Sequence, residues 1–237
     1  MKKALHYLTL YGYIIFIIIA CGNSSNKTSD NSSEEESATL SNNCLEPFYG
    51  KPENILTKEM VAKYVDFQGA EVESKTLAES LNKTELPKGF IDIASIQFKW
   101  KIDRQKYSVL LGSIKKIELY KSKTPVERFY AKYHTPTPEE QAEKKKAYDS
   151  LVLNSEEVKQ TDKANAKMLS EGIGFNFAYL NVDGIGDAAV WEHKVNGLLV
   201  LVGDYQFTVG VDLNKGNDHD LEKAKLIAKA IIEKACN

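Results

Sequence analysis

The first 43 residues contain no pattern from which a folded element could be built, and this confines any globular fold to the rest of the chain. Lys2 and Lys3 precede an apolar run over residues 8–20, and Cys21 ends that run. Behind Cys21, residues 22–43 contain almost no apolar side chains. Such a stretch cannot bury enough surface to offset its ordering entropy. We therefore expect residues 21–43 to form a flexible tether, whose mean span is roughly 25 Å by square-root scaling with length.

The apolar run is typical of a secretory signal peptide over residues 1–20. It is shorter than the roughly 20 apolar residues that a spanning helix needs, and two lysines precede it. Residues 18–21, Ile-Ile-Ala-Cys, resemble the lipobox of bacterial lipoproteins. The resemblance implies cleavage before Cys21 and acylation of its sulfur by chains such as palmitate, and two or more such chains hold a protein on a membrane. An uncleaved N-terminal anchor is the alternative.

The same resemblance predicts that the protein is located in the bacterial cell envelope, lipid-anchored outside the cytoplasm. Gly22 stands where enterobacterial lipoproteins of the inner membrane carry Asp, so the outer membrane is favoured if the cell has one. Residues 34–36, all Glu, keep the tether solvated. The alternative for these acids is a surface-export signal, since some lipoproteins of Bacteroidota carry acidic residues nearer to the cysteine.

Cysteine placement favours a disulfide between Cys44 and Cys236. One lies at each end of the remaining chain, domain termini often lie close together, and an oxidising compartment favours pairing. Two unpaired thiols are the alternative. Neither residue has a Cys-x-x-Cys partner, which argues against redox catalysis and zinc binding.

The composition of the chain is that of one ordinary globular domain, which we place at residues 44–237. Apolar residues make up 43% and charged residues 27% of the chain, near the average for folded proteins. The net charge is −2 and the basic residues are spread along the sequence, so no nucleic-acid partner is expected.

Local patterns predict an α+β domain with an antiparallel sheet packed against helices and a helical insert between two strand groups. Thr57 is a natural N-cap for a first helix. Strands are predicted over residues 95–102 and 107–121, and Gly112 is the candidate position for a bulge. Helices should begin at Thr124 and Thr137 and fill an insert of about 124–172. Later strands are predicted over residues 175–182, 188–193, 198–202 and 205–211, and a final amphipathic helix ends the chain.

Residues 182–191, Val-Asp-Gly-Ile-Gly-Asp-Ala-Ala-Val-Trp, and the apolar run after them carry a second resemblance. They are similar to a pattern in small, poorly characterised bacterial lipoproteins, some of which have a helix-backed antiparallel sheet of the kind named after PsbP and Mog1. The resemblance covers about a third of the chain. It implies the fold and no shared activity, and the long insert departs from the compact version.

No catalytic constellation is recognisable, and no cofactor is expected. The glycines and aspartates of residues 183–187 lack the spacing of a phosphate loop and are interpreted as a plain turn. A calcium-type loop of oxygen ligands would use Asp212, Asn214, Asp218 and Asp220, but the EF-hand spacing is absent, and a solvated loop is the favoured interpretation. His134, His193 and His219 are isolated from one another in the sequence.

Two classes of function remain open at this point. The favoured one is a non-catalytic lipoprotein that binds a protein or another envelope component, with the helical insert as a candidate arm. The apolar face of that arm would be Val126, Phe129, Tyr130 and Tyr133, packing on the domain or on a partner. The other is an enzyme or small-ligand carrier whose site is assembled from scattered residues, which a pocket lined by convergent carboxylates or histidines would reveal.

Overall fold

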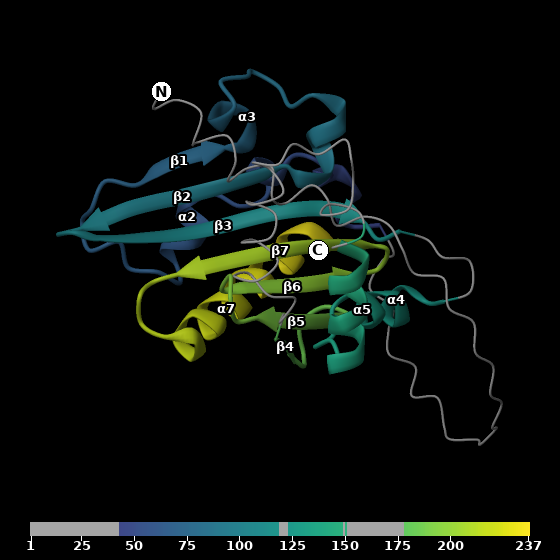
Figure 1. Cartoon of the computed structure of the whole chain (residues 1–237). Helices are drawn as coiled ribbons and strands as arrows, with labels where there is room; N and C mark the ends of the chain where they lie inside the picture. Colours follow the sequence, from purple (N-terminus) through teal and green to yellow (C-terminus); the bar gives the residue numbers. More distant parts are fainter. Residues whose placement is uncertain (1–42, 119–122, 149, 151–177) are drawn as a thin grey trace, which may run out of the picture. The chain divides into compact units, whose positions relative to one another are not determined.

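A seven-stranded antiparallel sheet organises the domain. The computed structural model describes residues 43–118, 123–148, 150 and 178–237. The strands lie side by side in the order β1-β2-β3-β7-β6-β5-β4 (Figure 1). In chain order they are β1 (Glu73–Thr76), β2 (Ser95–Ile102), β3 (Gln105–Lys116), β4 (Tyr179–Asn181), β5 (Ala188–Glu192), β6 (Gly197–Val202) and β7 (Tyr205–Asp212).

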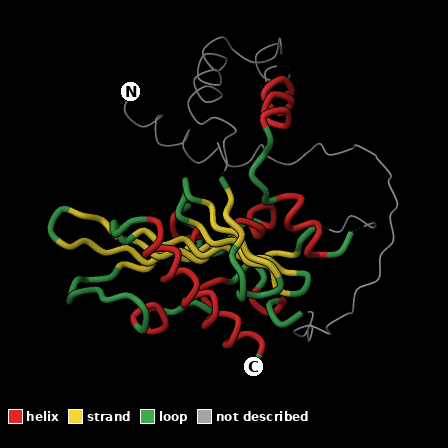
Figure 2. Tube along the Cα trace, turned by 90° about the horizontal axis from the view of Figure 1, so that it is seen from below, coloured by secondary structure: helices red, strands yellow, loops and turns green. Residues whose placement is uncertain are grey.

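Helices cover both faces of this sheet. The α-helices in the described part are α2 (Lys58–Ala62), α3 (Leu77–Ser80), α4 (Pro125–Lys132), α5 (Pro138–Tyr148) and α7 (Asn217–Cys236). Short 3₁₀ helices are η1 (Glu46–Phe48), η2 (Pro52–Asn54) and η3 (Lys88–Ile93). Figure 2 shows α7, the long helix that ends at the C-terminus, running along one side of the strands. The architecture is therefore the predicted α+β fold.

The larger hydrophobic core lies between the sheet and α7, and we call this side of the sheet the core face. Alternate residues of the central strands point to it, among them Val109, Leu111 and Val209. α7 contributes Leu221, Ala224, Ile227, Ala228 and Ile231 at helical spacing. Trp100 and Trp191 are buried here as well, so both tryptophans are core residues.

The opposite side, which we call the outer face, has a smaller core under α4. Phe129 of α4 is fully buried there, against a group that includes Ile117 of the segment after β3. The sheet supplies Ala188, Val190 and Leu201 from β5 and β6. α4 thus covers one end of the outer face, and the strands beyond it carry more polar side chains.

Most element starts follow the sequence prediction. Thr57 caps α2 by accepting a hydrogen bond from the amide of Met60. Thr124 forms a reciprocal capping box with Glu127 at the start of α4, and Thr137 exchanges the same two bonds with Glu140 before α5. The predicted bulge is present as a register shift between Gly112 and Lys115.

Two expected strand boundaries differ from the structure, and most of the expected insert lies outside the described residues. The strand predicted over residues 107–121 is found as β3, Gln105–Lys116. It begins earlier because the turn before it is tight, with a positive φ of 56° at Asp103, and residues 119–121 lie outside the described part. The strand predicted over residues 175–182 is found only as β4, and residues 175–177 lie outside the described part. For the same reason the structure says nothing of the insert beyond residue 150.

Candidate functional site

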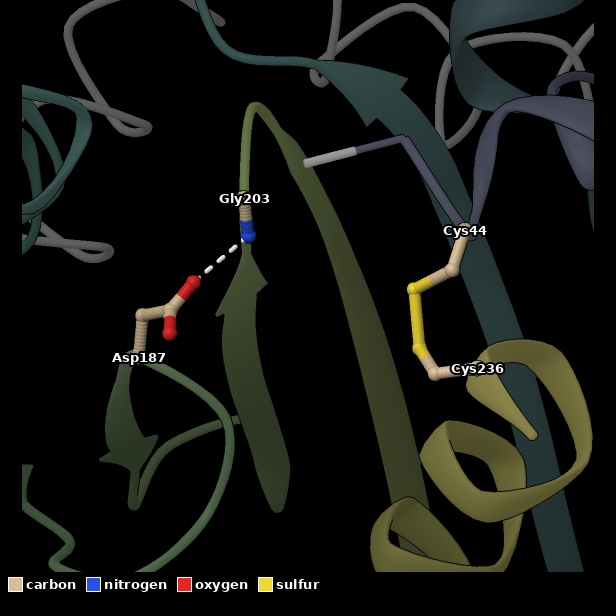
Figure 3. The surroundings of a disulfide bond; sticks show 4 residues. All are labelled: Cys44, Asp187, Gly203 and Cys236. Atoms are coloured by element: carbon tan, nitrogen blue, oxygen red, sulfur yellow. Dashed lines mark hydrogen bonds between the residues drawn. A yellow bond between two sulfur atoms is a disulfide. The ribbon is translucent and has the colours of Figure 1, made fainter. Parts of the chain in front are cut away.

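The two ends of the described domain are joined covalently, as predicted. The Cys44–Cys236 disulfide spans 192 residues of sequence, and its Cα atoms are 5.0 Å apart. Figure 3 shows it between the start of the described chain and the last turn of α7. The Lys234 ammonium donates to the carbonyls of Asn54 and Ile55 at 3.2 and 2.9 Å. The C-terminal turn of α7 therefore holds the N-terminal segment through the disulfide and through the hydrogen bonds of Lys234.

The glycine-rich turn at residues 183–187 is a structural joint. The Asp187 carboxylate accepts a 2.6 Å hydrogen bond from the amide of Gly203, drawn in Figure 3, and the Asp187 amide donates to Leu201. Gly186 has a φ of 59°, and a Cβ at this position would meet the Leu201 carbonyl oxygen. The residues of this turn hold the β4–β5 connection against the β6–β7 connection.

The four candidate oxygen ligands between β7 and α7 have separate roles. Asn214 donates to the Lys106 carbonyl at 2.7 Å, while Asp212 and Asp218 are exposed. Asp220 is only 1% exposed, and its carboxylate accepts from the Leu213 amide at 3.3 Å. Burial raises the pKa of the Asp220 carboxyl. Among the described residues, no group of three or more His, Cys, Asp or Glu could hold a metal ion.

The burial of Asp220 departs from the solvated loop that the sequence favoured. Its carboxylate ties the start of α7 back to the end of β7, which is a local structural role. The signal in the sequence was position: Asp220 precedes Leu221 in the first turn of α7, next to the residues that enter the core.

The predicted apolar face of the insert packs on the domain. Phe129 lies in the smaller core, with Val126, Tyr130 and Tyr133 partly buried around it. The Phe129 ring contacts those of Tyr130 and Tyr133 at centroid distances of 5.8 and 5.0 Å. The Tyr133 hydroxyl donates to Gln206 of β7 at 3.2 Å. The structure therefore realises the first of the two expected alternatives for these four side chains.

Three titratable groups with altered pKa values lie on the outer face. Burial raises the pKa of Tyr133 to about 12 and also raises the pKa of Glu192. Burial, with Lys132 as a second cause, lowers the pKa of Lys115, whose strand neighbour is Gln206. Shifted groups mark a catalytic site when they converge on one another. The charge of Glu192 adds to the rise in the pKa of Tyr133, and no hydrogen bond joins any two of these three side chains in the described part.

The histidines are held at three different places. His134 lies between the Ala131 carbonyl, 2.9 Å from Nδ1, and the Glu140 carboxylate, 3.0 Å from Nε2, and so links α4 to α5. His193 is 3.5 Å from Asn217, and His219 is 3.5 Å from Asp220. Each has its own neighbour, and the structure brings none of them to a shared centre in the residues it describes.

A surface hollow near the first α-helix of the domain is lined by charged and aromatic side chains. It has a volume of about 640 Å³ and lies between the α2 region and α7. Lys58, Lys63 and Lys223 line it together with Asp66 and Phe67. Its volume falls within the range of ligand sites, yet among its described residues no polar side chain is both buried and aimed into it, so it carries no assigned chemistry.

The sequence predicts the strand over residues 95–102 but not which residues of the next strand lie opposite its lysines, and so a pair of like charges in the structure was missed. The register of β2 and β3 sets Lys101 directly opposite Lys106. The signal was available in principle, because a tight turn at Asp103–Arg104 fixes that register.

Comparison with protein-family models, with curated proteins and with solved structures finds no match for this chain. The resemblance of residues 182–191 to small bacterial lipoproteins therefore stays a prediction. None of the helices in the described ranges combines the length and the apolar composition that crossing a bilayer requires.

Proposed function

We propose that this chain is a lipid-anchored protein of the bacterial cell envelope, whose globular domain is a non-catalytic binding module. The observation that supports a location outside the cytoplasm is the Cys44–Cys236 disulfide. Disulfides persist in oxidising compartments outside the cytoplasm, where an exported lipoprotein resides. The bridge also joins the first residues after the proposed tether to the end of α7. A force on the tether would therefore be transmitted to α7 through a covalent bond.

The anchor in this proposal is acyl chains on Cys21. The support comes from the sequence: a short positively charged start, an apolar run too short to span a bilayer, and an Ile-Ile-Ala-Cys cleavage region. Two or more chains, each contributing about 0.8 kcal/mol per buried methylene, give stable attachment where one chain does not.

Intact mass of protein extracted from membranes tests this anchor. We expect a mature chain that lacks residues 1–20 and carries acyl mass. The Cys21→Ser variant should remain unprocessed or leave the membrane fraction, while a Ser24→Ala variant three residues away should behave as the wild type. Normally processed, membrane-bound Cys21→Ser protein would refute the proposal.

The binding role draws support from α5. Its side chains are exposed along most of its length, and the Thr137–Glu140 bonds hold its first turn. The packing of the Phe129 face on the sheet leaves α5 as the part of the described insert that is open to a partner. Helices with charged side chains on all sides are found where they bridge to something else or carry many ion pairs.

A deletion separates docking from folding. Residues 136–170 are replaced by a short Gly-Ser link, which leaves α4 in place. We expect the deletion protein to keep its cooperative unfolding and to lose the envelope protein that co-purifies with the full chain. A variant with charge-reversing substitutions at Lys144 and Lys145 leaves α5 in the chain and serves as a milder probe. Retention of the same partner by the folded deletion protein would exclude the insert as the docking arm.

A further inference from the structure

The hairpin of β2 and β3 projects beyond its neighbours in the sheet. β1 pairs with β2 only as far as Lys99, and β7 pairs with β3 only from Ser108 onward. Between these limits the two strands pair with each other alone, and Figure 1 shows them extending past β1 and β7. We call residues 99–106 of this hairpin the basic ribbon.

The basic ribbon concentrates positive charge in a chain that is negative overall. It carries Lys99, Lys101, Arg104 and Lys106 against one carboxylate, Asp103, which gives a local net charge of +3. Because the whole chain has a net charge of −2, the other residues together carry −5. All four cationic side chains are exposed. Within the described residues none of them has an ion-pair partner.

The lysines of the ribbon share one side. The core-face alternation of Phe98, Trp100 and Tyr107 places Lys99, Lys101 and Lys106 on the outer face. Phe67 packs on Trp100, and Trp100 stacks on Tyr107 at 5.7 Å, which braces the ribbon from the core side. The lysines are thus presented on a braced, two-stranded support.

The pairing of Lys101 with Lys106 opposes folding. Like charges directly opposite one another in an antiparallel pair are destabilising, and their Cβ atoms lie only about 5 Å apart. Glu73 lies opposite Lys99 and offsets the charge of that lysine. It leaves the repulsion between Lys101 and Lys106 unchanged. The repulsion between the two ammonium groups falls when dense negative charge stands in front of them.

We infer that the basic ribbon binds the anionic phospholipid surface of the membrane. A flat lysine-bearing face fits a flat array of phosphate headgroups, and each lysine near such a surface raises affinity about fivefold. Three lysines and one arginine alone give weak binding. The membrane role also rests on the proposed anchor, because a tether multiplies weak binding by holding the domain at a high effective concentration.

The length of the proposed tether permits this contact. The ribbon and the disulfide lie at opposite ends of β3 and α7, and a strand the length of β3 spans about 40 Å. Residues 22–43 reach at most about 75 Å when fully extended. A domain anchored through Cys21 can therefore lie with its outer face toward the lipid.

Vesicle co-sedimentation tests the ribbon without the anchor. The protein is the chain from residue 21 onward with Cys21→Ser, which retains the whole described core because all its members lie between Cys44 and Cys236. We expect binding to vesicles that contain phosphatidylglycerol, weak or no binding to pure phosphatidylcholine, and a decline with added salt. Equal binding to both vesicles would overturn the inference.

Charge reversal within the ribbon locates the contact. The Lys101→Glu/Lys106→Glu variant should bind phosphatidylglycerol vesicles more than about tenfold less tightly. The control, Lys88→Glu/Lys229→Glu, makes the same change in net charge at two exposed lysines outside the ribbon and should bind as the parent does. An equal loss in both variants would mean that net charge alone is responsible, and this would overturn the ribbon's role.

A single substitution separates binding from folding. Lys101→Glu puts opposite charges across from each other, so the melting temperature should rise while vesicle binding falls. Lower binding with a lower melting temperature would indicate a damaged hairpin and would count against the inference. Because none of these proteins is acylated, a failure here leaves the Cys21 proposal standing, and the mass measurement on Cys21 leaves the ribbon untouched.

Discussion

Single positions in the β4–β5 turn differ sharply in what they tolerate. Gly184 and Gly186 both have a positive φ, of 72° and 59°. A Cβ at Gly184 would meet nothing within 4 Å, whereas one at Gly186 would meet the backbone of Leu201 and the side chain of Val200 at 2.9 Å. Position 184 requires glycine only because of its backbone angle. Position 186 requires glycine because of its backbone angle and because a side chain would have no room.

Gly186→Ala should therefore destabilise the protein more than Gly184→Ala. The left-handed backbone conformation costs a non-glycine residue about 1–2 kcal/mol, so both variants should be destabilised by this amount. At Gly186 the Leu201 strand must also shift, so we expect a total above about 3 kcal/mol. Urea unfolding of the two variants measures the difference. Equal losses would show that the turn moves freely away from β6.

Two glutamates on the same domain should give opposite dependences of stability on pH. Burial raises the pKa of Glu192 above its ordinary 4.5, so ionisation costs stability as the pH rises through that range. Bonds from the Thr124 backbone and side chain lower the pKa of Glu127, so its stabilisation is present above 4.5 and is lost as the pH falls through the folded-state value.

Glu192→Gln should accordingly gain stability relative to the wild type as the pH rises from below 4.5 to neutral. Glu127→Gln is the matched control and should lose relative stability over the same interval. Denaturant unfolding at a series of pH values gives both differences. The same sign for both variants would contradict the assigned environments.

At the scale of elements, α4 belongs to the fold. Its capping box could be read from Thr124, Pro125 and Glu127, and its apolar face from the spacing of Val126, Phe129 and Tyr133. The sequence did not show what that face covers, because Ala188, Val190 and Leu201 reach it only through sheet pairing. Burial against a distant element is not encoded in local spacing.

Phe129→Ala should cost about 3–5 kcal/mol of the free energy of unfolding, as expected for a fully buried aromatic side chain. Thr124→Ala, which removes the N-cap of the same helix, should cost about 1 kcal/mol. Chemical denaturation compares the two. A small effect of Phe129→Ala would instead indicate that the packing of α4 on the sheet contributes little to the stability of the domain.

Predictability across the elements follows the strength of the local signal. α7 and β2 could be placed because their apolar residues repeat at clear helical and strand periods. β1 was missed because its residues are Glu73, Ser74, Lys75 and Thr76, mostly exposed at the sheet edge, where nothing apolar marks a strand. α3 was missed too, although Thr76 and Glu79 spell its capping box.

For the candidate sites, the sequence predicted single residues better than groups. Cys44 and Cys236 were paired correctly because only two cysteines remained and the termini of domains tend to meet. The charge pair of the basic ribbon needed the register of two strands, and the burial of Asp220 needed the position of α7 over the sheet. Both are properties of tertiary structure.

For the whole molecule, the disulfide closes the longest loop that the domain contains. In the chain-entropy account, a bridge across 192 residues stabilises by about 5 kcal/mol, chiefly by restricting the unfolded chain. It also secures an N-terminal segment whose Leu45, Ile55 and Leu56 are fully buried. Loss of the bridge should therefore act on global stability and on this segment in particular.

The Cys44→Ser/Cys236→Ser variant should unfold cooperatively with a free energy lower by up to about 5 kcal/mol. Calorimetry of this variant and of the wild type with and without reductant measures the loss, since reductant should move only the wild type. Hydrogen exchange should show the largest early gain at residues 45–57, because packing and the Lys234 bonds alone then hold that segment. An unchanged melting temperature, or exchange spread evenly over the sheet, would contradict the view that the bridge holds the two ends of the domain together.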